Sequence, residues 1–330
     1  MHTTPPNTPT KPDDPKSDDL ALLIEVAMLY YEEGRTQAEI GRRVGTSRST
    51  VSRLLQEARA RGVVQISIDY SLARDSLLER ELRERFALKE VRVLRSFGRS
   101  ESEIIGGMGQ LAASYLDEVV SDGMTVGVSY GRSVASVVQR VKPKNLSDLV
   151  VLQVIGALGS GNPLQDGPDL ARQLANTCGA TYRYLHAPLM VESVRTRELL
   201  SHEPLVRDLL QTARQADVIL MGVSPLTPDT AGLIFTDYLN KADLEKLSAS
   251  GAVGHMCAQF FGADGQLTDT PFNERAITIG LKTLRDVREV VTVAGGAGKA
   301  QAILGALRGG YTDVLVTDDA AAQAISAQGT

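Results

Sequence analysis

The sequence predicts an α/β protein with two domains: a small N-terminal helix-turn-helix domain and a larger domain with a mostly parallel, Rossmann-like sheet. Two short helical patterns joined by a glycine lie within the first 62 residues. From about residue 89 to the C-terminus, apolar strand-like runs alternate with helical patterns, an order typical of a parallel sheet between layers of helices. A chain of 330 residues is long enough for two such domains.

The N-terminus, MHTTPPNTPTKPDDPKSDD, is polar and rich in proline. It lacks the apolar stretch of a signal peptide, and we expect residues 1–19 to be a disordered tail. The sequence has no run of 18 apolar residues, so no membrane span is expected. Cys178 and Cys257 lie far apart in apolar or small-residue surroundings, which indicates buried free thiols in a cytoplasmic protein.

Residues 20–70 are expected to form the helix-turn-helix domain, beginning with a supporting helix. Thr36 and Glu39 have the T-x-x-E spacing of a capping box, so the next helix should begin at Gln37. Gly45 suits the turn because glycine adopts a positive φ readily. A second helix is predicted over residues 47–61, with the helices sharing a core of Ile40, Val44, Val51 and Leu54.

The strand VVQISIDY, residues 63–70, is expected to close this domain as a small wing. The charged helical stretch SLARDSLLERELRERFAL, residues 71–88, is expected to link it to the larger domain over residues 89–330.

Charge is segregated along the chain, which carries a net charge of −5. Residues 35–65 hold seven arginines and two glutamates, whereas residues 1–34 hold two lysines and seven acids. A local basic patch in an acidic chain indicates binding to DNA phosphates. The residues expected at DNA, mostly on the second helix, are Gln37, Thr46, Ser47, Arg48, Ser49, Thr50, Ser52 and Arg53. The alternative is a plain helical hairpin with a solvated arginine face.

The strands of the larger domain are expected at nine apolar runs, which begin at Val91, Met124, Leu149, Thr181, Asp217, Ala258, Ala276, Val290 and Asp313. In a parallel sheet, ligands bind outside the carboxyl ends of the strands. Two strand-to-helix turns carry groups suited to a phosphate: GVSYGRS, residues 127–133, and VAGGAGKAQAIL, residues 293–304. Arg132 and Lys299 each stand at a predicted helix start, where backbone N–H groups attract an anion.

The two turns lack the specific sequence motifs of nucleotide-binding proteins. The second turn fails the Walker A pattern because Ala300 follows Lys299 where serine or threonine is needed. It also fails the G-x-G-x-x-G fingerprint, since Gln301 stands in the last glycine position. Ordinary glycine-rich turns with exposed Arg and Lys remain an alternative. Further strand-end turns that could line the same crevice are residues 155–161, 221–225 and 251–261.

Beyond these patterns, the chain resembles the SorC-type regulators, a sugar-binding family grouped with DeoR regulators. The resemblance covers residues 20–327 and rests on the helix-turn-helix followed by ARARGVVQISI, and on VGVSYGRSV, HAPLMVES, ARQADVILMGVSP, GAVGHMCAQFF and the long segment from VVTVAGGAGKAQAIL to DVLVTDDAAAQAI. It implies an effector domain similar to sugar-phosphate isomerases and deaminases that binds a phosphorylated sugar. It also implies tetramers in which the effector alters operator binding.

With this resemblance, the expected effector-site residues are Gly127, Ser129, Tyr130, Gly131, Arg132, Ser133, Gly156, Gly222, Ser224, Gly254, His255, Gly296 and Lys299. The chain departs from the family pattern at three of its positions. Many relatives carry an acidic residue where this chain has His255, and tryptophan where it has Tyr130. Some carry lysine where it has Ile155, which cannot form a Schiff base, so a covalently held aldehyde sugar is not expected.

We therefore expect a transcriptional regulator of a carbohydrate operon that works without catalytic residues, cofactor or metal. Its partners would be operator DNA with palindromic or direct half-sites, a phosphorylated sugar and further copies of the chain. The alternative is a sugar-phosphate isomerase or deaminase with a DNA-binding appendage. That chemistry needs a positioned general base, and His255, in GAVGHMCAQFF, is the candidate that titrates near neutral pH.

Overall fold

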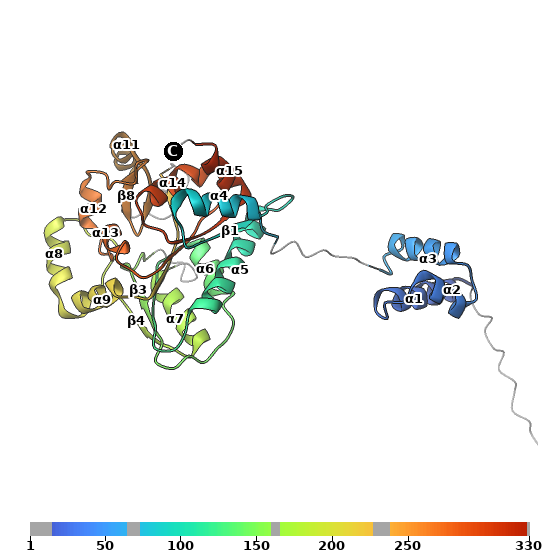
Figure 1. The fold of residues 1–330 in the computed structure, drawn as a ribbon. Helices are drawn as coiled ribbons and strands as arrows, with labels where there is room; N and C mark the ends of the chain where they lie inside the picture. The colour runs from blue at the N-terminus through green and yellow to red at the C-terminus, as the bar shows by residue number, and fades with distance from the viewer. Residues whose placement is uncertain (1–14, 65–72, 160–165, 227–237, 329–330) are drawn as a thin grey trace, which may run out of the picture. The chain divides into compact units, whose positions relative to one another are not determined.

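The computed structural model describes residues 15–64, 73–159, 166–226 and 238–328. The chain divides into two compact units, Met1–Asp69 and Tyr70–Thr330 (Figure 1). None of the helices in the described ranges is long and apolar enough to cross a membrane.

The first unit is the predicted helix-turn-helix, built from α1 (Pro15–Tyr31), α2 (Gln37–Val44) and α3 (Arg48–Ala60). The capping box is confirmed: Glu39 N–H donates to Thr36 Oγ1, and Thr36 N–H donates to Glu39 Oε2 at 2.9 Å. Gly45 ends α2 in the left-handed region, with φ of 72°. Helix α1 begins at Pro15, so the tail expected over residues 1–19 is wrong for its last five residues. Residues 1–14 of that tail, and residues 65–70 of the expected wing strand, lie outside the described residues.

The three helices share one apolar core, as predicted from the helical spacing. Ile40 of α2 and Val51 of α3 are buried against α1, and Val44 and Leu54 pack at the margin. Gly41 is needed where α2 meets the turn, because a Cβ there would lie 2.7 Å from the Thr46 carbonyl oxygen. This close approach sets how tightly α3 can follow α2.

The second unit begins with α4 (Ser76–Phe86), the expected linker helix. It packs against β1 (Glu90–Leu94) and α15 (Asp319–Ser326), and Leu82 is completely buried there. Val93 N–H donates to Glu79 Oε1 at 2.9 Å. Helix α4 is therefore an integral part of the second unit.

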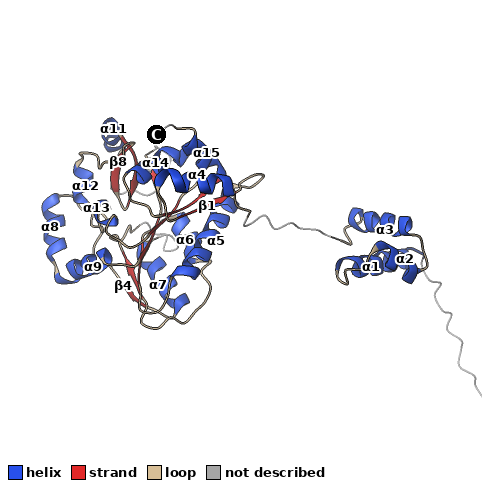
Figure 2. Ribbon diagram, viewed as in Figure 1, coloured by secondary structure: helices blue, strands red, loops and turns tan. Residues whose placement is uncertain are grey.

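The second unit is organised around a seven-stranded, fully parallel sheet in the order β1-β10-β9-β5-β2-β3-β4. Figure 2 draws the strands in red, with the helices around them in blue. Its other strands are β2 (Thr125–Val128), β3 (Val150–Gln153), β4 (Thr181–Arg183), β5 (Val218–Met221), β9 (Val290–Val293) and β10 (Val314–Asp318). Alternate residues of the strands enter two separate cores, one on each face. The parallel α/β fold is thus confirmed.

Helices cover both faces of this sheet. Helices α5 (Glu101–Val119), α6 (Arg132–Val138) and α7 (Gly167–Cys178) belong to one core, and α14 (Ala300–Arg308), α15 and α4 belong to the other. The remaining helices are α8 (Val194–His202), α9 (Pro204–Arg214), α11 (Lys241–Ala249), α12 (Pro271–Arg275), α13 (Leu281–Leu284) and the 3₁₀ turn η1 (Ala297–Lys299). Cys178 and Cys257 are free and buried, as expected.

Two of the predicted strands do not join the parallel sheet. The run from Ala258 forms β8 (Gln259–Gly262), which pairs with β7 (Ala252–Met256) and β6 (Ser224–Pro225) in a separate antiparallel sheet. The run from Ala276 makes only isolated bridges, Met190 to Ala276 and Ile155 to Thr278.

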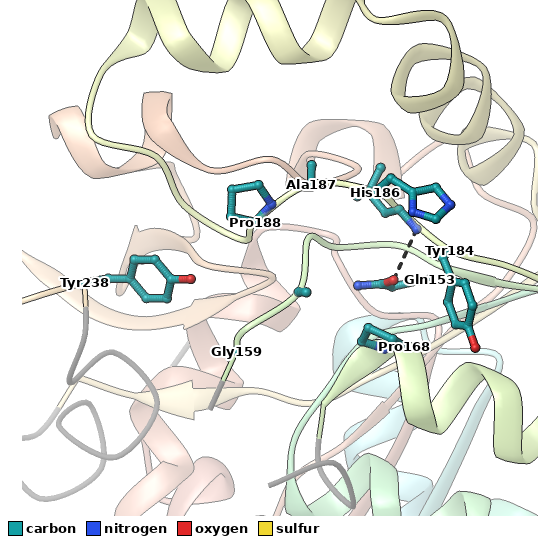
Figure 3. Close-up of a pocket in the computed structure, with 10 residues that line it drawn as sticks. Gln153, Gly159, Pro168, Tyr184, His186, Ala187, Pro188 and Tyr238 are labelled. Carbon is teal, nitrogen blue, oxygen red and sulfur yellow. Dashed lines mark hydrogen bonds between the residues drawn. The ribbon is translucent and has the colours of Figure 1, made fainter. Parts of the chain in front are cut away.

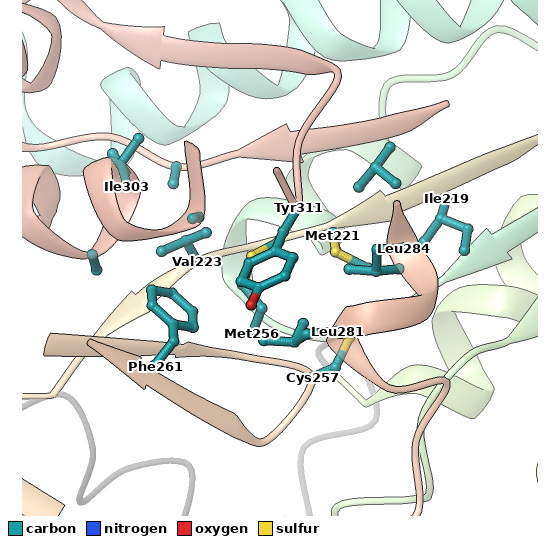
Figure 4. Close-up of a cluster of buried hydrophobic side chains, with 14 of the residues drawn as sticks. Ile219, Met221, Val223, Met256, Cys257, Phe261, Leu281, Leu284, Ile303 and Tyr311 are labelled. Carbon is teal, nitrogen blue, oxygen red and sulfur yellow. The ribbon is translucent and has the colours of Figure 1, made fainter. Parts of the chain in front are cut away.

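The β7–β8 hairpin turns at Cys257 and Ala258, which have φ of 48° and 59°. Two-residue turns of this kind normally use Asn-Gly or Asp-Gly, so the sequence carries no turn signal here. Both residues are buried in the apolar cluster drawn in Figure 4, where Cys257 lies with Leu281, Leu284 and Tyr311. Burial in this cluster stabilises a turn that local preference disfavours.

Candidate functional site

The strand order creates a switch point at the carboxyl edge of the sheet. After β2, the chain adds β3 and then β4 on one side of the sheet. After β5, it adds β9 and then β10 on the other side, so the connections diverge between the neighbouring strands β2 and β5. Such a divergence opens a crevice outside the strand ends, where ligands of α/β proteins bind. Val128 pairs with Leu220, and Met221 pairs with Thr292, so β2, β5 and β9 end at the same level. The predicted turns after these strands therefore emerge side by side.

Arg132 and Lys299 come together at this edge, although they are about 170 residues apart in the chain. Burial lowers the pKa of Lys299 and the positive charge of Arg132 lowers it further, while the carboxylates of Glu101 and Asp318 act in the opposite direction and leave the net shift downward. Arg132 is about half exposed and its guanidinium pairs with Glu101 at 3.0 Å. Within the described part of the chain, Lys299 makes no ion pair. A partly buried ammonium beside a guanidinium is an environment that an anion would stabilise.

His255 lies next to this pair of cations. It is 2% exposed on β7, opposite Ser224 of β6, and its ring packs on Phe260 at 5.5 Å. Burial, and then the charge of Lys299, lower the pKa of His255 to about 3. The imidazole is therefore neutral at physiological pH, and it contributes hydrogen-bonding capacity without charge.

Ser129 and Tyr130 are also buried at the end of β2. Ser129 N–H donates to the Leu220 carbonyl at 3.0 Å, which joins this turn to β5. Burial raises the pKa of the Tyr130 phenol, and the nearby Cys257 raises it further, so Tyr130 stays protonated. Ser133 is half-buried in the first turn of α6.

The six predicted site glycines divide into two groups. Gly131 and Gly296 have φ of 105° and 92°, and a Cβ at either would meet no atom within 4 Å. Gly222 is nearly as open, since its Cβ would meet only the Val293 carbonyl oxygen at 3.7 Å. Their backbones can thus be approached by a ligand.

The other three glycines are explained by packing. A Cβ at Gly127 would lie 2.5 Å from Val154, one at Gly156 would lie 2.2 Å from the Pro188 oxygen, and one at Gly254 would lie 2.5 Å from Ala302. At these positions neighbouring strands and loops pack too closely for a Cβ. The close packing therefore explains each glycine without a ligand.

Asp318 was missed by sequence reasoning. Its carboxylate is 1% exposed, and Oδ1 accepts hydrogen bonds from Gly296 N and Ala321 N, both at 2.9 Å. It therefore caps α15 and also holds the loop that carries Lys299. The signal in the sequence was an aspartate at a strand end immediately before a helix, an N-cap pattern.

A cavity of about 460 Å³ lies at the carboxyl ends of β3 and β4 (Figure 3). Tyr238 stands across it from Tyr184 and His186, and Gln153 holds the wall by accepting a bond from Leu185 N at 3.1 Å. None of the thirteen predicted effector residues lines this cavity, but Ala157 and Gly159 of its wall belong to the turn 155–161 that the sequence suggested as a crevice wall. Its volume lies in the range of small-molecule sites.

The first unit presents a basic surface on α2 and α3. Arg42, Arg43, Arg48 and Arg53 are exposed, and within the described ranges none of them pairs with a carboxylate. Ser47 is used as the N-cap of α3, since its Oγ accepts from Thr50 N at 3.1 Å. Ser49 is exposed, while Gln37, Thr46, Thr50 and Ser52 are half-buried. Seven of the eight predicted DNA-facing residues thus lie in the turn and first two turns of α3, residues 46–53, whereas Gln37 begins α2.

Comparison with known proteins matches both units. Residues 70–326 match the family model described as "Putative sugar-binding domain", and residues 25–61 match region 4 of sigma-70. The Sorbitol operon regulator of Klebsiella pneumoniae is 33% identical over 92% of this chain and 96% of its own. The Deoxyribonucleoside regulator of Bacillus subtilis is 31% identical with the same coverage of both chains.

Solved structures agree with these matches. The full-length sorbitol operon regulator SorC from K. pneumoniae aligns with a TM-score of 0.70 at 30% identity, covering 93% of this chain and 98% of that one. A DeoR family regulator from Listeria monocytogenes gives the same TM-score at 28% identity, covering 75% of this chain and 98% of that one.

A DNA-binding helix-turn-helix joined to a sugar-binding α/β domain defines a class of transcriptional regulators. These relatives are regulators rather than enzymes, as the sequence led us to expect. The chain belongs to the SorC/DeoR family of sugar-binding transcriptional regulators.

The double role of Asp318 predicts a measurable loss of stability. Asp318→Ala should lower the free energy of unfolding by about 0.5–2 kcal/mol, since an N-cap is lost, and should free the loop at Gly296. Asp318→Asn keeps an acceptor oxygen and should retain most of the stability. Urea denaturation followed by tyrosine fluorescence measures both. Equal stability of Asp318→Ala and the native chain would show that this carboxylate holds neither element.

Proposed function

We propose that the chain regulates a carbohydrate operon and that a phosphorylated sugar, bound at the carboxyl edge of the parallel sheet, controls its binding to operator DNA. The observation that carries the proposal is the convergence of Arg132 and Lys299 beside the switch point, with the pKa of Lys299 lowered. The names of the relatives, a sorbitol operon regulator and a deoxyribonucleoside regulator, support a carbohydrate-related ligand.

A phosphate dianion suits the two cations better than a neutral sugar does. It would reverse the lowering of the Lys299 pKa, and each charge-assisted hydrogen bond would contribute about 1.5–3 kcal/mol. Arg132, Lys299, Ser129 and Ser133 would hold the phosphate, together with the open backbone at Gly131 and Gly296. Ser224, Tyr130, Gly222 and neutral His255 would then face the sugar.

The environment of Ile155 argues for reversible binding. Ile155 is completely buried, and its side chain has no nucleophile to form an imine with an aldehyde sugar. The ligand would be held by hydrogen bonds and charge alone, and its release would need no chemical step.

For DNA binding, we propose that α3 enters the major groove with Arg48 and Arg53 at the bases. The hydroxyl residues around its start would reach bases or phosphates. One such unit reads only a few base pairs, so two units must act together on palindromic or direct half-sites. We therefore propose an oligomer with an even number of copies, a tetramer by analogy with the family.

Replacing the two arginines of α3 tests the DNA interface. Arg48→Ala and Arg53→Ala should each cost about 1–3 kcal/mol of operator affinity and relax specificity at one base pair. Fluorescence anisotropy with operator variants measures both quantities. Arg95→Ala, in the second unit, is the control and should leave affinity unchanged. Unchanged affinity and specificity in both α3 variants would mean that another surface reads the DNA.

Replacing Lys299 tests the effector site. Lys299→Ala should abolish the effect of the sugar phosphate on operator binding, because the phosphate loses its most buried cation. Operator affinity without effector should stay within about twofold, since the basic DNA surface belongs to the other unit. Lys241→Ala, an exposed lysine of α11, is the matched control. A full effector response from Lys299→Ala would place the phosphate elsewhere.

A further inference from the structure

A second cavity, of about 340 Å³, lies between α8 and α9 on one side and the segment from α12 to α13 on the other. Four basic side chains line it: Arg197 of α8, Arg207 and Arg214 of α9, and Lys282 of α13. No aspartate or glutamate occurs among the described residues of its wall. The cavity is thus basic, and it shares no lining residue with the cavity of Figure 3.

The positive charge of this cavity is poorly compensated. Arg207 pairs with Asp208 at 3.1 Å, but both side chains are about half exposed, so the pair is weak. Arg197 donates through Nε to the Glu274 carbonyl at 3.0 Å, which fixes the guanidinium without neutralising it. Over the described ranges, Arg214 and Lys282 have no ion pair. Four cations around one cavity repel one another unless an anion enters it.

Helix α9 fixes the backbone positions of two of these cations. Its apolar face, with Val206, Leu209 and Leu210, is buried in a small core, so the helix cannot rotate. Arg207 and Arg214 are seven residues apart, which places them two turns, about 10.5 Å, apart along the helix. Gln211 lies between them and also lines the cavity. Both arginines line the same cavity, so their charges add to those of Arg197 and Lys282.

We propose that this cavity is a second ligand site, for a small metabolite that carries two or more oxyanion groups, phosphate or carboxylate. The cavity volume is within the range of small-molecule sites. Arginine forks match the geometry of both oxyanions, and four basic side chains with no acidic residue in the described wall favour a ligand that carries more than one anionic group. This ligand is additional to the sugar phosphate proposed at Lys299, and neither assignment depends on the other.

One stretch of backbone joins the basic cavity to the cavity of Figure 3. Ala276, Thr278, Ile279 and Gly280 form part of the basic cavity's wall. The same stretch bonds to the loop after β3: Gly156 N–H donates to the Ile277 carbonyl at 2.8 Å, and Ile279 N–H donates to the Val154 carbonyl at 3.0 Å. The loop after β3 lines the cavity of Figure 3 through Ala157 and Gly159, so this backbone segment supports both cavities.

Calorimetric titration of the full chain with pyrophosphate and, separately, with citrate tests the site at constant ionic strength. At least one probe should bind the native chain. Arg207→Gln/Arg214→Gln should weaken that binding at least tenfold, whereas Lys299→Gln should leave it in place. Arg195→Gln is the matched control, because Arg195 is an exposed residue of α8 outside the cavity wall. Circular dichroism checks that each variant is folded.

The preferred probe distinguishes a phosphate ligand from a carboxylate ligand, and either result supports the site. Failure of both probes to bind at millimolar concentration would overturn the proposal. So would binding that is lost in Lys299→Gln but kept in the α9 double variant, because the anion would then occupy the effector crevice alone.

Discussion

The structure of the second unit depends on one constraint: seven parallel strands end at the same edge of the sheet. Because β2, β5 and β9 are neighbours, the turns that follow them meet, although the chain between the first and the last is more than 150 residues long. This arrangement forces Arg132 and Lys299 together against their mutual repulsion. Burial of Lys299 increases that cost, and the carboxylates of Glu101 and Asp318 offset it only in part, so the pKa of Lys299 stays lowered.

Hydrogen bonds hold the loops at the carboxyl edge of the sheet in place. Asp318 holds Gly296, Ser129 bonds to β5, and the β6–β7 pairing brings His255 beside Lys299. The site therefore consists of charges placed on a rigid frame, and the frame is the parallel sheet with its two apolar cores. Such preorganisation lets a ligand bind without first ordering the loops that hold it.

Local chemistry made much of this fold predictable. The capping box at Thr36, the turn at Gly45 and the strand-to-helix turns after β2 and β9 each leave a short pattern in the sequence. Arg132 and Lys299 could be placed on one edge because parallel strands allow no other arrangement. The conformation of two stretches is set by tertiary packing and not by local sequence. The turn at Cys257 and Ala258 adopts positive φ without a typical turn residue. The run at Ala276 makes isolated bridges to two loops and does not join the sheet.

Features that depend on how distant segments of the chain pack together could not be predicted from the sequence. The glycines at 127, 156 and 254 looked like ligand contacts but are explained by close packing. The basic cavity gathers residues from α8, α9 and α13, and no spacing in the chain predicts that these helices share a wall. Asp318 stood in a recognisable N-cap pattern, but its bond to Gly296 depends on the pairing of β9 and β10.

The most direct measurement of the central claim is a calorimetric comparison of sugars with their own phosphates on the native chain. A panel of pentoses and hexoses, each tested beside its monophosphate, isolates the contribution of the anion at Arg132 and Lys299. The account predicts that the sugar that binds does so only as its phosphate, with the parent sugar at least a hundredfold weaker, since a loss of about 3 kcal/mol corresponds to that factor. A parent sugar that binds as tightly as its phosphate would contradict the claim that these two cations define the site.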